Sequence, residues 1–133
     1  MIESKIRRNV GKRSIDPTEA QIQIAVVQWC EAAHKVKAVH CPNELMRFLS
    51  EGQKYHFVKI GVVLGVHDLF LFEPRGKYHG CSIEIKRNKR CKASKEQIDW
   101  LHYLEKRGYF VKITYGLDET LETIEGYLNL ERT

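Results

Sequence analysis

The chain has 133 residues, of which 43% are apolar and 29% charged, values that fit one globular domain and exclude a second one. It carries 22 lysine and arginine residues against 17 aspartate and glutamate residues, and this net charge of +5 favours a polyanionic partner. No apolar run reaches membrane length and no signal-peptide pattern appears, so we expect a cytoplasmic protein without a membrane partner.

Residues 1–15 are polar and strongly basic and show no apolar periodicity. We predict a flexible basic N-terminal arm there, followed by a single domain over residues 16–133. Asp16 is the expected N-cap of the first helix, with Pro17 in its first turn and Glu19 at its third position. Apolar residues at helical spacing extend this helix to about residue 34.

The middle of the chain has weaker signals. A short strand is predicted over residues 36–41, and Pro42 ends it. Residues 43–53 are predicted to form a loop with one helical turn over residues 44–49, and residues 54–59 to form a short helix.

Two strands are predicted next, over residues 68–73 and 79–87, and the turn residues Glu73 to Lys77 join them. The spacing of the two strands predicts an antiparallel β-hairpin.

The last third of the chain predicts a helix, a strand and a second helix. A capping box at Ser94 and Gln97 opens the first helix and Gly108 ends it. A strand follows over residues 109–115, and Asp118 is the expected N-cap of the last helix. The order of elements predicts an α/β fold with a mixed central sheet and helices on both faces.

Charged residues interrupt the predicted hairpin at one end. Glu84 and Lys86 share one face of their strand because side chains alternate, and Asp68 begins the neighbouring strand opposite them. Buried carboxylates are costly unless they are paired or bind a metal, and Mg²⁺ or Mn²⁺ prefers such oxygen ligands. Asp68 and Glu84 are therefore candidate metal ligands, the carbonyl of Ile85 is a candidate third ligand, and Lys86 would orient water or stabilise developing charge.

Each of these residues has an ordinary structural explanation when taken alone. Asp68 would be a strand-start residue that bonds a turn, and Glu84 and Lys86 would form a solvent-facing stripe. Their combination, in this spacing and before a basic loop, favours the catalytic interpretation.

The chain resembles a known nuclease family at this constellation. It is similar to the virus-type replication-repair nuclease (VRR-NUC) branch of the PD-(D/E)XK nucleases over about residues 17–128. The residues that carry the resemblance are Thr18-Glu19 with Gln23, Gly65-Val66-His67-Asp68, Ile83-Glu84-Ile85-Lys86, Ser94 with Gln97 and Trp100, and Gly108. One departure is His67, which stands where the family signature usually has proline.

The resemblance implies a PD-(D/E)XK fold and further site residues. Glu19 would join the metal site, directly or through water. A capping box at the start of the first helix is an alternative, local explanation for a glutamate at this position. Gln97 would line the site or only cap its helix, and Gln23 lies one turn after Glu19. His67 would contact substrate or fill a turn, and residues 43–44 would approach the site.

A run of cations follows the E-x-K motif. We predict that it binds the DNA backbone without reading sequence, although a solvated loop is the ordinary explanation for such a run. The candidate DNA-binding residues are Arg87, Lys89, Arg90, Lys92 and Lys95.

The resemblance implies a metal-dependent endodeoxyribonuclease that uses Mg²⁺ or Mn²⁺ and acts on branched DNA. Small stand-alone members of the family imply a two-fold homodimer that cuts Holliday junctions, which suits a phage- or bacterium-encoded protein. Residues 45–49 and 55–57 are candidate dimer contacts. The alternatives are a flap or single-strand nuclease, a sequence-specific restriction-type enzyme, and a non-catalytic DNA-binding module.

Overall fold

The computed structural model describes residues 15–132. Fourteen of the fifteen residues of the predicted N-terminal arm therefore lie outside the described residues, and the arm stays a prediction. No helix in the described part of the chain is long and apolar enough to cross a membrane.

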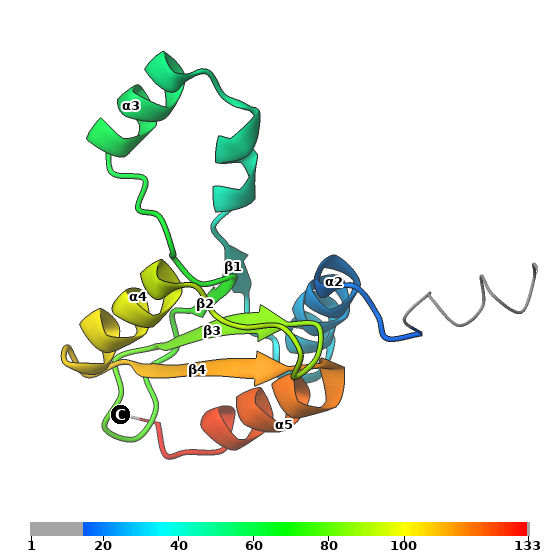
Figure 1. The fold of residues 1–133 in the computed structure, drawn as a ribbon. Helices are drawn as coiled ribbons and strands as arrows, with labels where there is room; N and C mark the ends of the chain where they lie inside the picture. The colour runs from blue at the N-terminus through cyan, green and yellow to red at the C-terminus, as the bar shows by residue number, and fades with distance from the viewer. Residues whose placement is uncertain (1–14, 133) are drawn as a thin grey trace, which may run out of the picture.

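A four-stranded mixed sheet forms the centre of the molecule (Figure 1). Its strands, in spatial order, are β1 (Ala38–His40), β2 (Leu69–Leu71), β3 (Cys81–Lys86) and β4 (Phe110–Tyr115). The first three strands pair antiparallel, whereas β3 and β4 are parallel and joined through a helix. The predicted β2–β3 hairpin and the mixed sheet are confirmed.

Helices cover both faces of this sheet, as predicted. On one face, α2 (Glu19–Trp29) and α5 (Leu117–Leu128) pack against each other and bury Ile83 and Ile85 of β3. On the other face, α4 (Lys95–Glu105) covers the alternate residues of β3. The strand is therefore apolar on one side and polar on the other, yet every one of its residues is buried. This arrangement is the PD-(D/E)XK-like fold.

The first helix begins later than predicted. Thr18 is its N-cap, because the Thr18 hydroxyl accepts a hydrogen bond from the backbone N–H of Gln21 at 3.2 Å. The Gln21 side-chain oxygen in turn accepts the backbone N–H of Thr18. The prediction that Asp16 is the N-cap was wrong. Asp16 lies two residues upstream of the cap, where its carboxylate accepts a hydrogen bond from the Asn88 amide. The helix continues as a π-helical turn over Cys30–His34.

Two other helix starts also differ from the predictions. Gly116, and not Asp118, is the N-cap of α5, because a positive φ of 85° turns the chain directly out of β4. Helix α3 (Glu51–Lys59) begins three residues before the predicted start, since Ser50 and Gln53 form a further capping box. The strands are shorter than predicted by one to three residues at their ends.

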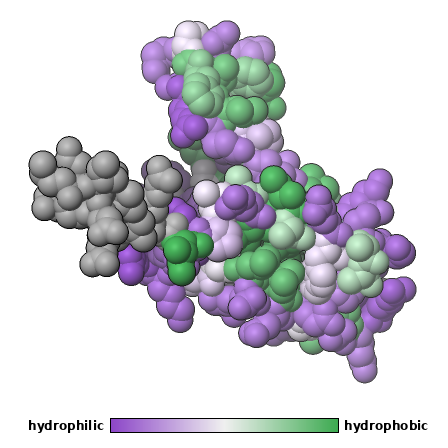
Figure 2. Space-filling model, turned by 90° about the vertical axis from the view of Figure 1, so that its right-hand side faces the viewer, coloured by the Kyte–Doolittle hydropathy of each residue, from purple (hydrophilic) through white to green (hydrophobic). Residues whose placement is uncertain are grey.

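Residues 41–66 form a helical projection that extends from the end of β1 and returns to β2 (Figure 1). It contains the 3₁₀ helix η2 (Asn43–Phe48) and α3. None of its residues is buried. Figure 2 shows hydrophobic side chains gathered on this projection, above the body of the molecule.

Candidate active site

Asp68 and Glu84 meet where β2 and β3 run side by side. Leu69 pairs with Ile83 in the antiparallel ladder, so Asp68, one residue earlier, lies across from Glu84. The Asp68 carboxylate accepts the backbone N–H of Ile85 at 2.7 Å. The predicted convergence of the two carboxylates therefore exists in the fold.

Lys86 and Gln97 complete a connected group around Glu84. The Lys86 ammonium lies 3.3 Å from Glu84 Oε1 and donates to Gln97 Oε1 at 2.9 Å, while Gln97 Nε2 donates to Glu84 Oε1 at 2.7 Å. Gln97 also forms the predicted capping box with Ser94. Gln97 therefore caps its helix and also contacts Lys86 and Glu84, because its amide oxygen accepts from the Ser94 backbone and from Lys86 at once.

Gly65 and His67 bring the Asp68 loop against the first turn of α4. Gly65 has a φ of 84°, and a Cβ there would collide with the backbone carbonyl of Glu96. His67 is only 2% exposed and lies 3.0 Å from both the Gln97 carbonyl and the Ser82 hydroxyl. A carbonyl only accepts, so Nε2 of His67 carries the proton and Nδ1 accepts from Ser82. His67 therefore links β3 to the start of α4 through buried hydrogen bonds. The expectations that it fills a turn or contacts substrate were wrong.

The buried carboxyl groups are held in an environment that disfavours their charge. Burial and the neighbouring Asp68 charge raise the pKa of Glu84 to about 8, against the opposing effect of Lys86. Burial also raises the pKa of Asp68, although the Ile85 N–H acts in the opposite direction. Burial lowers the pKa of His67, which keeps this ring neutral.

A divalent cation fits this environment. Glu84 Oε2 is buried and has no hydrogen-bond partner, an uncommon state for a carboxylate oxygen. A hard cation would satisfy that oxygen and relieve the repulsion between Glu84 and Asp68. Across residues 15–132, however, no three His, Cys, Asp or Glu side chains gather into a metal-binding cluster. An ion here would therefore draw further ligands from backbone carbonyls and water.

Glu19 lies at the edge of this site. It is exposed at the first position of α2, and its charge contributes to the raised pKa values of both Asp68 and Glu84. The capping explanation for Glu19 was wrong, because Gln21 makes the capping bond instead. Its carboxylate therefore does not cap the helix, and its negative charge acts on Asp68 and Glu84.

The comparisons with known proteins agree with this geometry. The VRR-NUC domain model matches residues 2–118. The chain belongs to the VRR-NUC family. A solved structure described as a VRR_NUC domain protein is similar at 28% sequence identity with a TM-score of 0.75, covering 87% of this chain and 92% of the other. None of the curated proteins compared with the chain matches it.

VRR-NUC membership makes the chain a member of a nuclease family, with hydrolase activity and a DNA substrate implied. It also explains why the G-x-x-D, E-x-K and S-x-x-Q segments converge on one end of the sheet. Glu84, Lys86 and Gln97 are joined by direct contacts in this VRR-NUC fold, and Asp68 lies across from Glu84 in the sheet and acts on it electrostatically.

One contact of the VRR-NUC site was not predicted from the sequence. His40, at the end of β1, lies 2.6 Å from the Asp68 carbonyl and 2.9 Å from the Glu44 carboxylate. Both partners are acceptors, so they favour the protonated ring, in which both nitrogens donate, and the Glu44 bond and the Asp68 carbonyl raise the pKa of His40 against the opposing effect of its burial. Glu44 thus reaches the site only through His40, while the Asn43 amide donates to the carbonyl of Val63 at the base of the helical projection.

The basic segment after β3 divides into two groups. Lys86 is buried in the site, and Arg87 donates to the carbonyl of Asp16. The other four cations are exposed on the loop and at the start of α4. They are Lys89, Arg90, Lys92 and Lys95.

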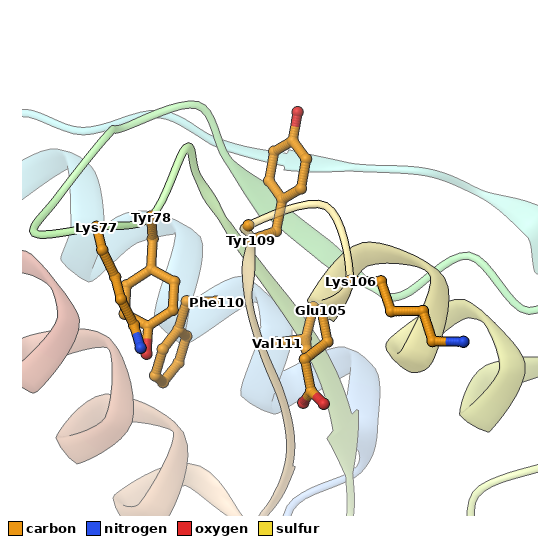
Figure 3. A pocket seen from close by; sticks show the side chains of 8 residues that line it. Lys77, Tyr78, Glu105, Lys106, Tyr109, Phe110 and Val111 are labelled. Atoms are coloured by element: carbon orange, nitrogen blue, oxygen red, sulfur yellow. The ribbon is translucent and has the colours of Figure 1, made fainter.

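A cavity of about 510 Å³ opens at the other end of the sheet (Figure 3). Lys77, Tyr78, Phe110 and Val111 line it, beside the residues that begin β3 and β4. The site residues lie at the opposite ends of these parallel strands, so this cavity is separate from the VRR-NUC site.

Proposed function

We propose that the chain is a metal-dependent, structure-specific endodeoxyribonuclease that cuts four-way DNA junctions as a homodimer. The observation that carries this proposal is the convergence of Asp68, Glu84 and Lys86, with one Glu84 oxygen buried and without a hydrogen-bond partner. A non-catalytic module would have no need to maintain such a costly group.

In this proposal Asp68 and Glu84 hold Mg²⁺ or Mn²⁺ together with the carbonyl of Ile85, and Glu19 contributes through water. When bound, such an ion neutralises charge on the phosphoryl oxygens and activates the attacking water. Water would add to phosphorus and release a proton to solvent, the bond to the leaving oxygen would break, and that oxygen would take up a proton from solvent.

The remaining side chains orient the reaction. The Lys86 ammonium, held by Glu84 and Gln97, would lie beside the attacked phosphate and stabilise its developing negative charge. Gln97 fixes both side chains from a helix start, and His67 and Gly65 hold that start against the Asp68 loop. The site is therefore preorganised from rigid elements.

The exposed cations after β3 would hold the DNA backbone. Lys89, Arg90, Lys92 and Lys95, with Arg87 at the base of the loop, would contact phosphates and carry no sequence information. Recognition would then depend on DNA shape, as a branched substrate requires. Each neutralised phosphate predicts a contribution of about −0.9 to the slope of log affinity against log salt.

The homodimer follows from the chemistry of a junction. Residues 15–132 hold one such site, whereas resolution of a four-way junction needs two symmetric nicks. A two-fold dimer relates its two sites as the junction relates its arms.

A cleavage assay with Mg²⁺ or Mn²⁺ on labelled junctions, flaps, single strands and plain duplexes tests this function. We expect paired symmetric nicks on the four-way junction. Preference for flaps or single strands would replace the junction assignment, and cutting of plain duplex at a fixed sequence would indicate a restriction-type enzyme. DNA binding without cleavage of any substrate would indicate a non-catalytic module.

A further inference from the structure

Strand β4 forms one edge of the sheet. Among the described residues it pairs with β3 alone, in the parallel sense (Figure 1). Backbone hydrogen bonds anchor this pairing at both ends, from the Phe110 N–H to Gly80 and from the Gly116 N–H to Lys86. Because backbone groups alternate in direction along a strand, the even-numbered residues of β4 bond to β3 and the odd-numbered residues point to the open side.

The chain closes the two ends of this open side but not its middle. The Tyr109 N–H donates to a carbonyl in the last turn of α4 at 3.2 Å, and the Tyr115 N–H donates to the Glu119 carboxylate at 3.2 Å. The odd-numbered residues between them are Val111 and Ile113. Their two N–H and two C=O groups have no partner on the open side within the described chain, and we call these four groups the free edge of β4.

A cavity lies beside the start of this free edge. It is the cavity of about 510 Å³ at the end of the sheet remote from the catalytic carboxylates (Figure 3). Phe110 and Val111 contribute apolar surface to it, and Tyr78 packs against the Phe110 ring in an edge-on arrangement. A volume in this range accommodates a bulky side chain together with part of its backbone.

Positive charge surrounds the free edge. Lys77, Lys106 and Lys112 are exposed there, and Glu105 is the acidic residue that lines the cavity. None of the three lysines forms an ion pair within the described chain. A ligand with acidic groups would therefore find complementary charge.

The unpaired backbone groups favour a polypeptide over the DNA backbone as the ligand. Phosphate oxygens only accept hydrogen bonds, so they could satisfy the two N–H groups but would be repelled by the two carbonyl oxygens. An extended polypeptide presents donors and acceptors in alternation along its length and can satisfy all four groups. The catalytic carboxylates also lie at the other end of β3, so DNA held there leaves this region uncovered.

We propose that the free edge of β4 binds an extended acidic segment of a partner protein, which adds a fifth strand to the sheet and inserts one bulky apolar side chain into the cavity. Main-chain hydrogen bonds to Val111 and Ile113 hold the segment, the cavity selects the inserted side chain, and the lysines favour acidic neighbours. This surface would attach the nuclease to another protein without covering its site. The proposal does not depend on which DNA the chain cuts.

Amide hydrogen exchange measured by NMR on the full chain tests whether the edge is free. We expect the Val111 and Ile113 amides to exchange faster than those of Lys112 and Thr114, whose N–H groups bond to β3. Slow exchange of all four amides in the chain alone would show that the chain itself covers the edge. Exchange that slows only as concentration rises would show that a second copy covers it, and either result would overturn the proposal.

A library of random short peptides displayed on phage, selected against the full chain, tests the ligand. We expect the recovered peptides to share a bulky apolar residue with acidic neighbours. A synthetic copy of a recovered peptide should slow exchange at Val111 and Ile113. The proposal fails when no recovered peptide protects these two amides, or when the protecting peptides are basic.

Variants separate the contribution of backbone pairing from that of charge. Val111→Pro removes an N–H of the free edge but no bond to β3, a change that edge strands tolerate, and should weaken peptide binding by at least about tenfold. Lys77→Glu, Lys106→Glu should also weaken it by at least about tenfold, because repulsion replaces attraction. Lys35→Glu, Lys37→Glu, just before β1 at the other edge of the sheet, is the matched control and should bind as the parent does.

The charge variants also keep the test decisive if the proline variant misfolds. Both lysine pairs are exposed, so their melting temperatures and DNA nicking should match those of the parent. Equal peptide binding by the parent and by Lys77→Glu, Lys106→Glu would overturn the proposal. Peptide binding in a chain that cuts no DNA would leave the proposal standing without the nuclease assignment, so the two fail separately.

Discussion

The site lies on β2, β3 and the start of α4, and the helical projection connects β1 to β2, yet the two regions are stabilised in opposite ways. At the site, Glu84, Lys86 and His67 are buried, and their side chains have polar partners within the chain. In the projection no residue is buried, and seven large apolar side chains are exposed. The difference shows that the fold itself holds the polar groups of the site, whereas it leaves large apolar side chains of the projection exposed.

The largest effect that would sharpen this contrast is expected from Lys86→Ala. Removing the buried ammonium should lower the single-turnover nicking rate by about 10²–10³-fold, because no other cation lies as close to Glu84 in the described residues. DNA binding measured by fluorescence anisotropy should persist. Lys106→Ala, at the exposed far end of α4, is the control. Normal cutting by Lys86→Ala with Mg²⁺ present would remove the assigned role.

Two glycines allow a direct comparison of the regions. Gly65→Ala should cost about 3 kcal/mol of unfolding free energy, since its φ of 84° disfavours a side chain and the added Cβ meets the Glu96 backbone. Gly52→Ala lies in α3 with no atom within 4 Å of its Cβ, and should instead gain about 0.5–1 kcal/mol from helix propensity. Denaturant unfolding measures both. Equal effects would contradict the contrast in packing.

Glu84→Gln should reveal the cost of the buried carboxylate through pH. The folded pKa of Glu84 is about 8, above its ordinary value of 4.5, so the folded state keeps the proton that the unfolded chain releases. Stability should therefore fall as pH rises from about 4.5 to about 8, and the glutamine variant should gain stability relative to the parent over that range.

The same variant tests the metal site without an activity assay. Mg²⁺ or Mn²⁺ should raise the melting temperature of the parent chain at pH 8, because the ion stabilises the ionised Glu84. It should raise that of Glu84→Gln much less. A variant that is equally stabilised by the ion, or stability that is flat with pH, would contradict the assignment.

The smallest effect is expected where the two regions meet. His40→Gln would weaken the bonds to the Asp68 carbonyl and Glu44, and should lower nicking by less than about tenfold because only the backbone of Asp68 is held there. His56→Gln on α3 is the control and should have no effect on nicking. A loss as large as that of Lys86→Ala would place His40 in the reaction itself.

Much of the site followed from strand alternation. The face shared by Glu84 and Lys86 and the position of Asp68 opposite them needed only the hairpin and its register. The helix starts were harder, because the observed caps Thr18 and Gly116 are intrinsically weaker N-cap residues than the predicted Asp16 and Asp118, which lie two residues away. In each case the choice depends on the backbone path into the helix, which the local sequence does not show.

His40 and the helical projection could not be predicted in the same way. His40 contacts Asp68 across 28 residues, so no local spacing indicates it. The sequence analysis named residues 45–49 and 55–57 as candidate surface contacts, but the projection that carries them depends on the path of the chain between β1 and β2, which no local pattern indicates. His67 similarly gains its role from Ser82 and Gln97, which lie on a strand and a helix far along the chain.

The bond between Asp68 and the main chain at Ile85 has a consequence for the E-x-K motif. The Asp68 carboxylate accepts a hydrogen bond from a backbone N–H, which every amino acid except proline provides. The middle position of the motif therefore contributes no particular side chain to the catalytic face. Valine or leucine at position 85 would keep this hydrogen bond and fill the same core space, whereas proline would remove the N–H that donates to Asp68. A motif position that tolerates many side chains can thus still require a backbone N–H.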